Sequence, residues 1–182
     1  MHVFRFSVIF VLLMAALCGA SADKPAQPKR GPFGVQADAI QCLRQNNVAG
    51  ASAALEAQVA KGMSRDARDQ AITAEWLGVA MYFYNVDQPS LAKVALAQAT
   101  DGAAALQNKK GAAAELYPLY RNLGSLTEII RHDRPTALAY YNLALTAARS
   151  NPQIAPSDLD ELVGKAAKTA QDDATAKEKK TK

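Results

Sequence analysis

Long segments rich in alanine and leucine, separated by short groups of turn residues, make up the chain from Val35 to Lys168. Alanine and leucine are strong helix formers, whereas strands favour β-branched and aromatic residues, which form few runs in this region. The pattern therefore predicts an all-α fold. A stretch of this size corresponds to one domain.

Turn residues divide this region into a series of expected helices. These span residues 35–45, 49–61, 65–86, 91–109, 112–131, 136–149 and 157–168. Ser64 is the expected N-cap of the third helix. Pro118 lies inside the fifth, where it either kinks the helix or marks its true start. The last helix has apolar residues on one side only, so we expect it to cover the end of the array.

The segment from Ala71 to Val86 is the most apolar part of this region, with twelve apolar residues out of sixteen. A helix that is apolar on nearly all sides is expected to be sandwiched between neighbouring helices. Its short length and Glu75 argue against a membrane span.

Two parts of the chain repeat one spacing of large and small residues. The first unit reads Trp76-x2-Val79-Ala80-x2-Phe83 and, eight residues later, Ala92-x3-Leu96-x2-Ala99. The second reads Tyr120-x2-Leu123-Gly124 and then Ala137-x3-Tyr141-x2-Ala144, with a link that is one residue longer. A weaker unit ends earlier, in Asn46-Asn47-x3-Ala51-x3-Leu55. Small residues allow two helix backbones to cross closely, so we expect such crossings at Ala80, Ala92, Gly124 and Ala137.

This spacing resembles that of the tetratricopeptide-like helical superfamily, in which paired helices carry large and small residues at these positions. Trp76 and Tyr120 are 44 residues apart, whereas the family period is about 34 residues. Ala104 also stands where the family has a closing proline. The resemblance implies a tetratricopeptide-like domain over residues 35–168, with about three helical hairpins and a C-terminal capping helix. A generic helical bundle is the alternative.

The resemblance also implies a concave surface lined by the first helix of each hairpin, which in such arrays binds peptides or partner proteins. The residues expected on this surface are Leu77, Met81, Tyr84, Asn85, Arg121, Ser125 and Glu128. Tyr84 and Asn85 would hold an extended backbone, and Arg121 would meet a carboxylate. The competing interpretation is that Leu77 and Met81 are ordinary core contacts.

Residues that carry catalysis or hold metals are scarce in the sequence. Its two histidines are His2 and His132, and His132 falls in an expected turn. No HExxH or CxxC pattern supplies zinc ligands, and no Walker or GxGxxG loop occurs. No nucleophile motif supports a Ser-His-Asp site. We therefore expect no enzyme, no metal site and no cofactor.

The N-terminus has the order of a secretory signal peptide. Arg5 precedes an apolar run from Val8 to Leu17, and small residues follow up to Ala22. Cleavage is expected after Ala22, so residues 1–22 form the signal. The run is about half as long as a membrane-spanning helix requires, so we expect no transmembrane anchor after cleavage. Leu17 before Cys18 argues against lipid attachment, which would leave Cys42 as a single, buried helix cysteine.

Two segments flank the expected domain. Residues 23–34 contain three prolines and two glycines, which is typical of a flexible linker. Residues 169–182 are lysine-rich without a large apolar residue, and we expect a disordered tail there. Segment 164–182 has six lysines against two aspartates and one glutamate, whereas 23–163 is formally neutral. The basic pI therefore comes from the tail, and no cationic face for nucleic acid is visible.

These features predict a periplasmic or secreted scaffold or adaptor. It would bind a peptide or partner protein in a helical groove and help to assemble or regulate a cell-envelope or secretion complex. The alternative is a non-catalytic carrier that holds a small apolar ligand or glycan between its helices. An enclosed apolar pocket beside Trp76 would favour the carrier, whereas an open groove with polar residues on its floor would favour peptide binding.

Overall fold

The computed structural model describes residues 37–59 and 62–180. The expected signal peptide, the linker at 23–34 and the expected domain start at Val35 lie outside these residues. Within the described ranges the protein is helical throughout its regular structure and contains no strand. The predicted all-α class is therefore confirmed.

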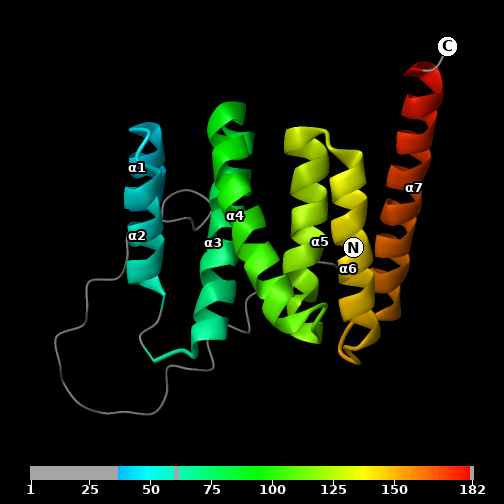
Figure 1. Cartoon of the computed structure of the whole chain (residues 1–182), viewed down its shortest axis with the longest axis horizontal. Coiled ribbons are helices and arrows are strands. Elements are labelled where there is room, and N and C mark those ends of the chain that lie inside the picture. The colour runs from blue at the N-terminus through cyan, green and yellow to red at the C-terminus, as the bar shows by residue number, and fades with distance from the viewer. Residues whose placement is uncertain (1–36, 60–61, 181–182) are drawn as a thin grey trace, which may run out of the picture.

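The helices follow one another along the long axis of the molecule (Figure 1), with α1 and α2 at one end and α7 at the other. Their bounds are α1 Ala37–Arg44, α2 Val48–Gln58, α3 Arg65–Asn85, α4 Pro89–Lys110, α5 Tyr117–Leu126, α6 Arg134–Arg149 and α7 Pro156–Lys180. A 3₁₀ turn, η3 (Ala114–Leu116), precedes α5, and a π-helical turn, η4 (Thr127–Arg131), continues it. The most extensive packing joins α3 to α4, α5 to α6, α6 to α7 and α1 to α2. None of these helices is both long and apolar enough to cross a membrane.

Local sequence signals place several helix starts as expected. The Ser64 side chain accepts a hydrogen bond of 3.3 Å from the backbone N–H of Ala67, which confirms Ser64 as the N-cap of α3. Pro118 lies in the first turn of α5. Proline suits this position because the first N–H groups of a helix have no partner within the helix. Pro118 therefore marks a start and not a kink.

The three helix pairs share one kind of turn. Asn46, Asp87 and His132 have φ values of 57°, 55° and 55°, and they are the only non-glycine residues with positive φ in the described ranges. Each ends the first helix of a pair, and the second helix begins two residues later. In the first pair the N–H of Asn47 bonds to the carbonyl of Cys42 at 2.9 Å. This is the long bond of a Schellman helix end.

The π turn η4 accounts for the longer link in the second repeat unit. Ala92 follows Ala80 by twelve residues, whereas Ala137 follows Gly124 by thirteen. A π turn closes over one residue more than an α turn. The extra residue is therefore taken up within the first helix of the pair. The turn at His132 keeps the same backbone geometry as the turns at Asn46 and Asp87.

The small residues of the repeat lie in the core as expected. Ala80, Ala92 and Ala137 are fully buried. At Gly124, a Cβ atom would lie 2.5 Å from Cε1 of Tyr141 on α6, so the α5 backbone rests directly on that ring. Close approach at Gly124 therefore depends on the absence of a side chain.

The expectation that the last helix ends near Lys168, with a disordered tail after it, is wrong, because α7 continues to Lys180. Thr169, the first residue beyond the expected end, is 2% exposed, and its hydroxyl donates a 3.2 Å hydrogen bond to Glu128. Thr169 thus anchors the start of this part of α7 without a large apolar side chain. The alanines at 170, 174 and 176 also favour the helix.

Candidate functional site

Helices α3, α5 and α7 line an open groove made of three adjoining hollows. Ile129 in η4 lines all three. The first, of about 270 Å³, is lined by Ala74, Leu77, Gly78, Met81, Asn122, Ser125, Leu126 and Ile129. The second, of about 390 Å³, adds Glu128, Tyr141, Lys165, Lys168, Thr169 and Asp172. The third, of about 460 Å³, adds Tyr84, His132 and Arg134. We call the whole surface the α3–α5–α7 groove.

The three helices present the same stripe of positions to this groove. The lining residues are 74, 77, 78 and 81 on α3, then 122, 125, 126 and 129 on α5 and η4, and 165, 168, 169 and 172 on α7. Positions separated by three, four and seven residues lie on one face of a helix. Each helix therefore turns a single face to the groove, as a repeated unit would.

The structure brings five of the seven expected binding residues together in this groove: Leu77, Met81, Tyr84, Ser125 and Glu128. Leu77 is 5% exposed, so it is mainly a core contact, in line with the competing interpretation. Met81 and Tyr84 are 50% and 43% exposed. These two side chains are therefore available to a partner.

The other two expected residues do not line the groove. Asn85 is exposed at the end of α3. Arg121 donates through Nη2 to Oε1 of Glu161 on α7 at 3.1 Å, so it meets a carboxylate of its own chain. Glu161 also pairs with Lys165 Nζ at 2.8 Å. The hydrogen bond and charge of Lys165, followed by the charge of Arg121, hold the pKa of Glu161 below its usual value.

Glu128 joins three elements of the groove wall. The Tyr141 hydroxyl on α6 donates to Oε2 of Glu128 at 3.1 Å, and the Thr169 hydroxyl on α7 donates to Oε1 at 3.2 Å. The Tyr141 hydroxyl also lies 3.4 Å from Ser125 Oγ. Burial raises the pKa of Tyr141, so its hydroxyl stays protonated and remains a donor. Glu128 and Ser125 therefore build the wall rather than stand free within it.

We expect Glu128→Ala to lower the free energy of unfolding by about 1–3 kcal/mol, because two part-buried hydroxyls lose a charged acceptor. Glu128→Gln keeps one acceptor oxygen and is expected to cost less. Urea unfolding followed by circular dichroism measures both. Equal stability of the alanine variant and the unchanged protein would contradict the structural role of Glu128.

Sequence reasoning missed Ile129, Arg134 and Lys168 as groove residues. Ile129 is 38% exposed and follows Glu128 in the π turn. The signal for this turn was the longer link of the second repeat unit, which did not by itself show where the extra residue lies. The π turn also buries Thr127, whose hydroxyl has no hydrogen-bond partner in the described part of the chain. Single π turns occur frequently at functional sites.

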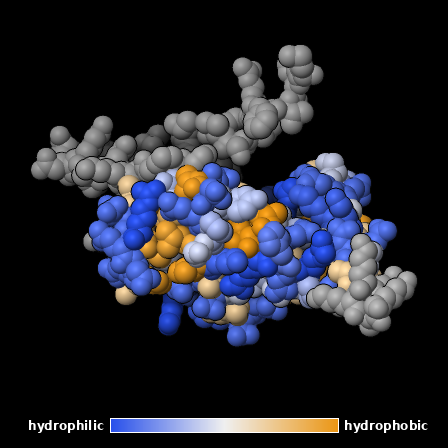
Figure 2. Space-filling view, turned by 90° about the horizontal axis from the view of Figure 1, so that it is seen from above, coloured by the Kyte–Doolittle hydropathy of each residue, from blue (hydrophilic) through white to orange (hydrophobic). Residues whose placement is uncertain are grey.

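The third hollow lies at the end of the molecule where α3 turns into α4 and η4 turns into α6. Figure 2 views this end from above and shows apolar side chains gathered between hydrophilic ones. Exposed large apolar residues from these helix ends are Tyr84, Val86 and Ile129. The surface is therefore not uniformly hydrophilic at this end of the molecule.

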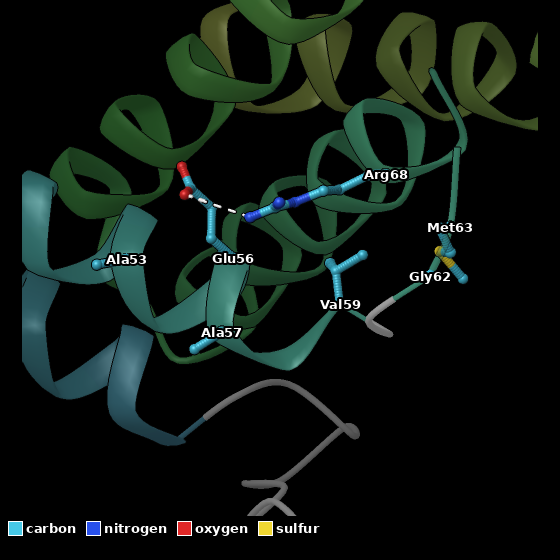
Figure 3. Close-up of a pocket in the computed structure, with 7 residues that line it drawn as sticks. All are labelled: Ala53, Glu56, Ala57, Val59, Gly62, Met63 and Arg68. Atoms are coloured by element: carbon cyan, nitrogen blue, oxygen red, sulfur yellow. Dashed lines mark ion pairs between the residues drawn. The ribbon is translucent and has the colours of Figure 1, made fainter. Parts of the chain in front are cut away.

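A separate hollow between α2 and α3 is a weaker candidate (Figure 3). Glu56 and Arg68 form an ion pair of 3.7 Å across it, and both side chains are about half exposed. Exposed pairs of this kind contribute little to stability. Its lining includes Val59 and Gly62, between which the described ranges are interrupted. No residue that the sequence singled out lines it.

The described residues contain no cluster of three or more histidine, cysteine, aspartate or glutamate side chains placed to hold a metal ion. His132 lies at the left-handed end of η4 and lines the groove with Tyr84 and Arg134. No family model, curated protein or solved structure matches the chain.

Proposed function

We propose that this protein is a tetratricopeptide-like interaction module that binds a segment of a partner protein in the α3–α5–α7 groove. The observation that carries the proposal is the exposure of large apolar side chains there. Met81, Tyr84 and Ile129 are three of the six large apolar residues that are exposed in the described part of the chain. Concentrated apolar exposure of this kind marks interaction sites on soluble proteins.

The shape of the groove favours a protein segment over a small carried ligand. Its floor and walls include polar side chains, among them Asn122, Ser125 and Lys168. Trp76, beside which an enclosed pocket would have favoured the carrier, is 4% exposed and packs in the core. It borders none of the hollows described above. An elongated surface with spaced apolar anchors and polar rims suits a peptide or helix of a partner protein.

The proposed place of action rests on the N-terminal sequence alone. A charged start, an apolar run and small residues at 20–22 support export, and with it a role in the periplasm or outside the cell. There the module would help to assemble or regulate a cell-envelope or secretion complex. Fractionation of cells that produce the full chain tests this part, since recovery of the uncleaved chain in the cytosol would contradict it.

The groove itself is tested by exchanging its exposed apolar side chains. Met81→Ser with Ile129→Ser removes two anchors without touching the buried core. We expect at least about a tenfold loss of affinity, because each lost apolar contact is worth about 1 kcal/mol or more. The measurement is quantitative capture of partners from the native cell extract, followed by titration of the purified partner.

The matched control is Met63→Ser with Val163→Ser, because both residues are 48% exposed and lie outside the groove. Circular dichroism and thermal melting establish that both double variants stay folded. Equal losses of affinity in the two double variants, or no loss in either, would count against the groove as the binding surface.

A further inference from the structure

The walls of the groove differ in charge. The α3 wall, formed by Ala74, Leu77, Gly78, Met81 and Tyr84, carries no ionisable side chain other than the tyrosine. The opposite wall on α7 carries Lys165, Lys168 and Asp172. Arg134, at the start of α6, lines the third hollow with Tyr84. A ligand in the groove therefore meets apolar groups on one side and mostly cations on the other.

Two of these cations are available to a ligand. Lys165 is engaged by Glu161 at 2.8 Å. Among the described residues, no carboxylate lies within ion-pair distance of Lys168 or Arg134. Lys168 belongs to the second hollow and Arg134 to the third, so they lie along the groove rather than at one point.

The acids of the groove offset these cations only in part. Both carboxylate oxygens of Glu128 already accept hydrogen bonds from Tyr141 and Thr169. Glu161 is held by Arg121 and Lys165. Asp172 is the acid that remains on the α7 wall. The residues that line the groove include three cations, Lys165, Lys168 and Arg134, against two acids, Glu128 and Asp172, so its formal net charge is +1.

We propose that the groove selects an acidic segment of a partner protein with apolar side chains on one face. This inference rests on the proposed function and specifies its ligand. The apolar side chains would pack on Met81 and Ile129, and carboxylates would approach Lys168 and Arg134. Complementary charges at such a rim contribute mainly selectivity and association rate, and salt weakens them.

Selection from a displayed library of random peptides on the full chain tests the inference. We expect enriched peptides to combine leucine, methionine or aromatic residues with an excess of aspartate and glutamate over lysine and arginine. An enriched peptide should bind several-fold more weakly when its acids are changed to amides, and more weakly at high salt.

Two pairs of variants assign the selectivity to the groove. Arg134→Gln with Lys168→Gln is expected to remove the acidic preference while apolar selection persists. Lys93→Gln with Arg149→Gln is the matched control, because this exposed lysine and arginine lie on α4 and α6 and line none of the hollows described above. The control should keep the preference of the unchanged protein.

The outcomes separate this inference from the function on which it rests. Peptides that depend on Met81 and Ile129 but show no acidic excess would overturn the charge selectivity and leave the groove as a binding site. The charge selectivity would likewise be overturned, and the groove would remain a binding site, if peptides selected on the Arg134→Gln with Lys168→Gln variant still showed an acidic excess. A selection that yields no peptide dependent on Met81 and Ile129 would overturn both.

Discussion

Phe83→Ala is expected to lower the free energy of unfolding by about 3–5 kcal/mol, which is the usual cost of removing a fully buried aromatic ring. Phe83 has no exposed surface and lies edge-on to Tyr82, with the ring centres 5.2 Å apart. Single domains are stable by only about 5–15 kcal/mol. We therefore expect this one substitution to remove a large share of the total stability, as measured by urea or thermal denaturation.

The adjacent residue provides the control. Tyr84 is 43% exposed at the groove, so Tyr84→Ala is expected to change stability by no more than about 1 kcal/mol. Its expected effect is on partner affinity. The two variants thus separate the core face of α3 from its groove face. Equal stability losses in the two variants would mean that α3 is not oriented as the structure has it.

The second large effect is expected at the crossing of α5 and α6. A methyl group added by Gly124→Ala would meet Cε1 and Cδ1 of Tyr141 at 2.5 and 2.6 Å. The ring is 1% exposed and its hydroxyl is held by Glu128, so it has no room to withdraw. We expect a loss of about 1–3 kcal/mol, as for other overpacked cores, measured by urea unfolding.

Gly164→Ala is the matched control within α7. Apart from the adjacent residues and backbone of α7 itself, no atom lies within 4 Å of the position that its Cβ would take, so this substitution is expected to stabilise the helix by up to about 1 kcal/mol. The same chemical change should therefore have opposite signs at the two glycines. A gain in stability at Gly124 would show that the helices do not cross closely there.

The crossing at Gly124 also matters for the groove. The Tyr141 ring that rests on Gly124 carries the hydroxyl that bonds Glu128. Displacement of the ring would therefore disturb the contact between η4 and α6, and with it the wall that carries Ile129. We expect Gly124→Ala to weaken partner binding beyond what its loss of stability explains, whereas Gly164→Ala should leave affinity unchanged.

Local signals in the sequence were sufficient for most helix boundaries. Ser64 caps α3 and Asn46 ends α1, because each depends on bonds within a few residues of the chain. At Pro118 the sequence left both a kink and a helix start open, and the structure places the start of α5 there instead of at residue 112. The buried small residues were also predictable, because Ala80, Ala92 and Ala137 each stand three or four residues from a large apolar residue of their own helix, which places them on its buried face.

The groove was predictable only in part. Met81 and Tyr84 face it because of their helical spacing, but the partner of Arg121 could not be read from the sequence. That partner, Glu161, lies 40 residues away in the chain. Contacts of this kind depend on how α5 and α7 pack, and no local pattern specifies them.

The sequence by itself determined that this protein is helical, where most of its helices begin and end, and which small residues let them approach. Only the tertiary structure decided that one extra residue becomes the π turn at Thr127–Arg131, and that α7 continues to Lys180. The physical reason is that contacts between distant segments contribute to both outcomes: Glu128 in the π turn accepts hydrogen bonds from Tyr141 and Thr169, and the second of these adds to the helix propensity of α7. The energy of such contacts is absent from any short stretch of sequence.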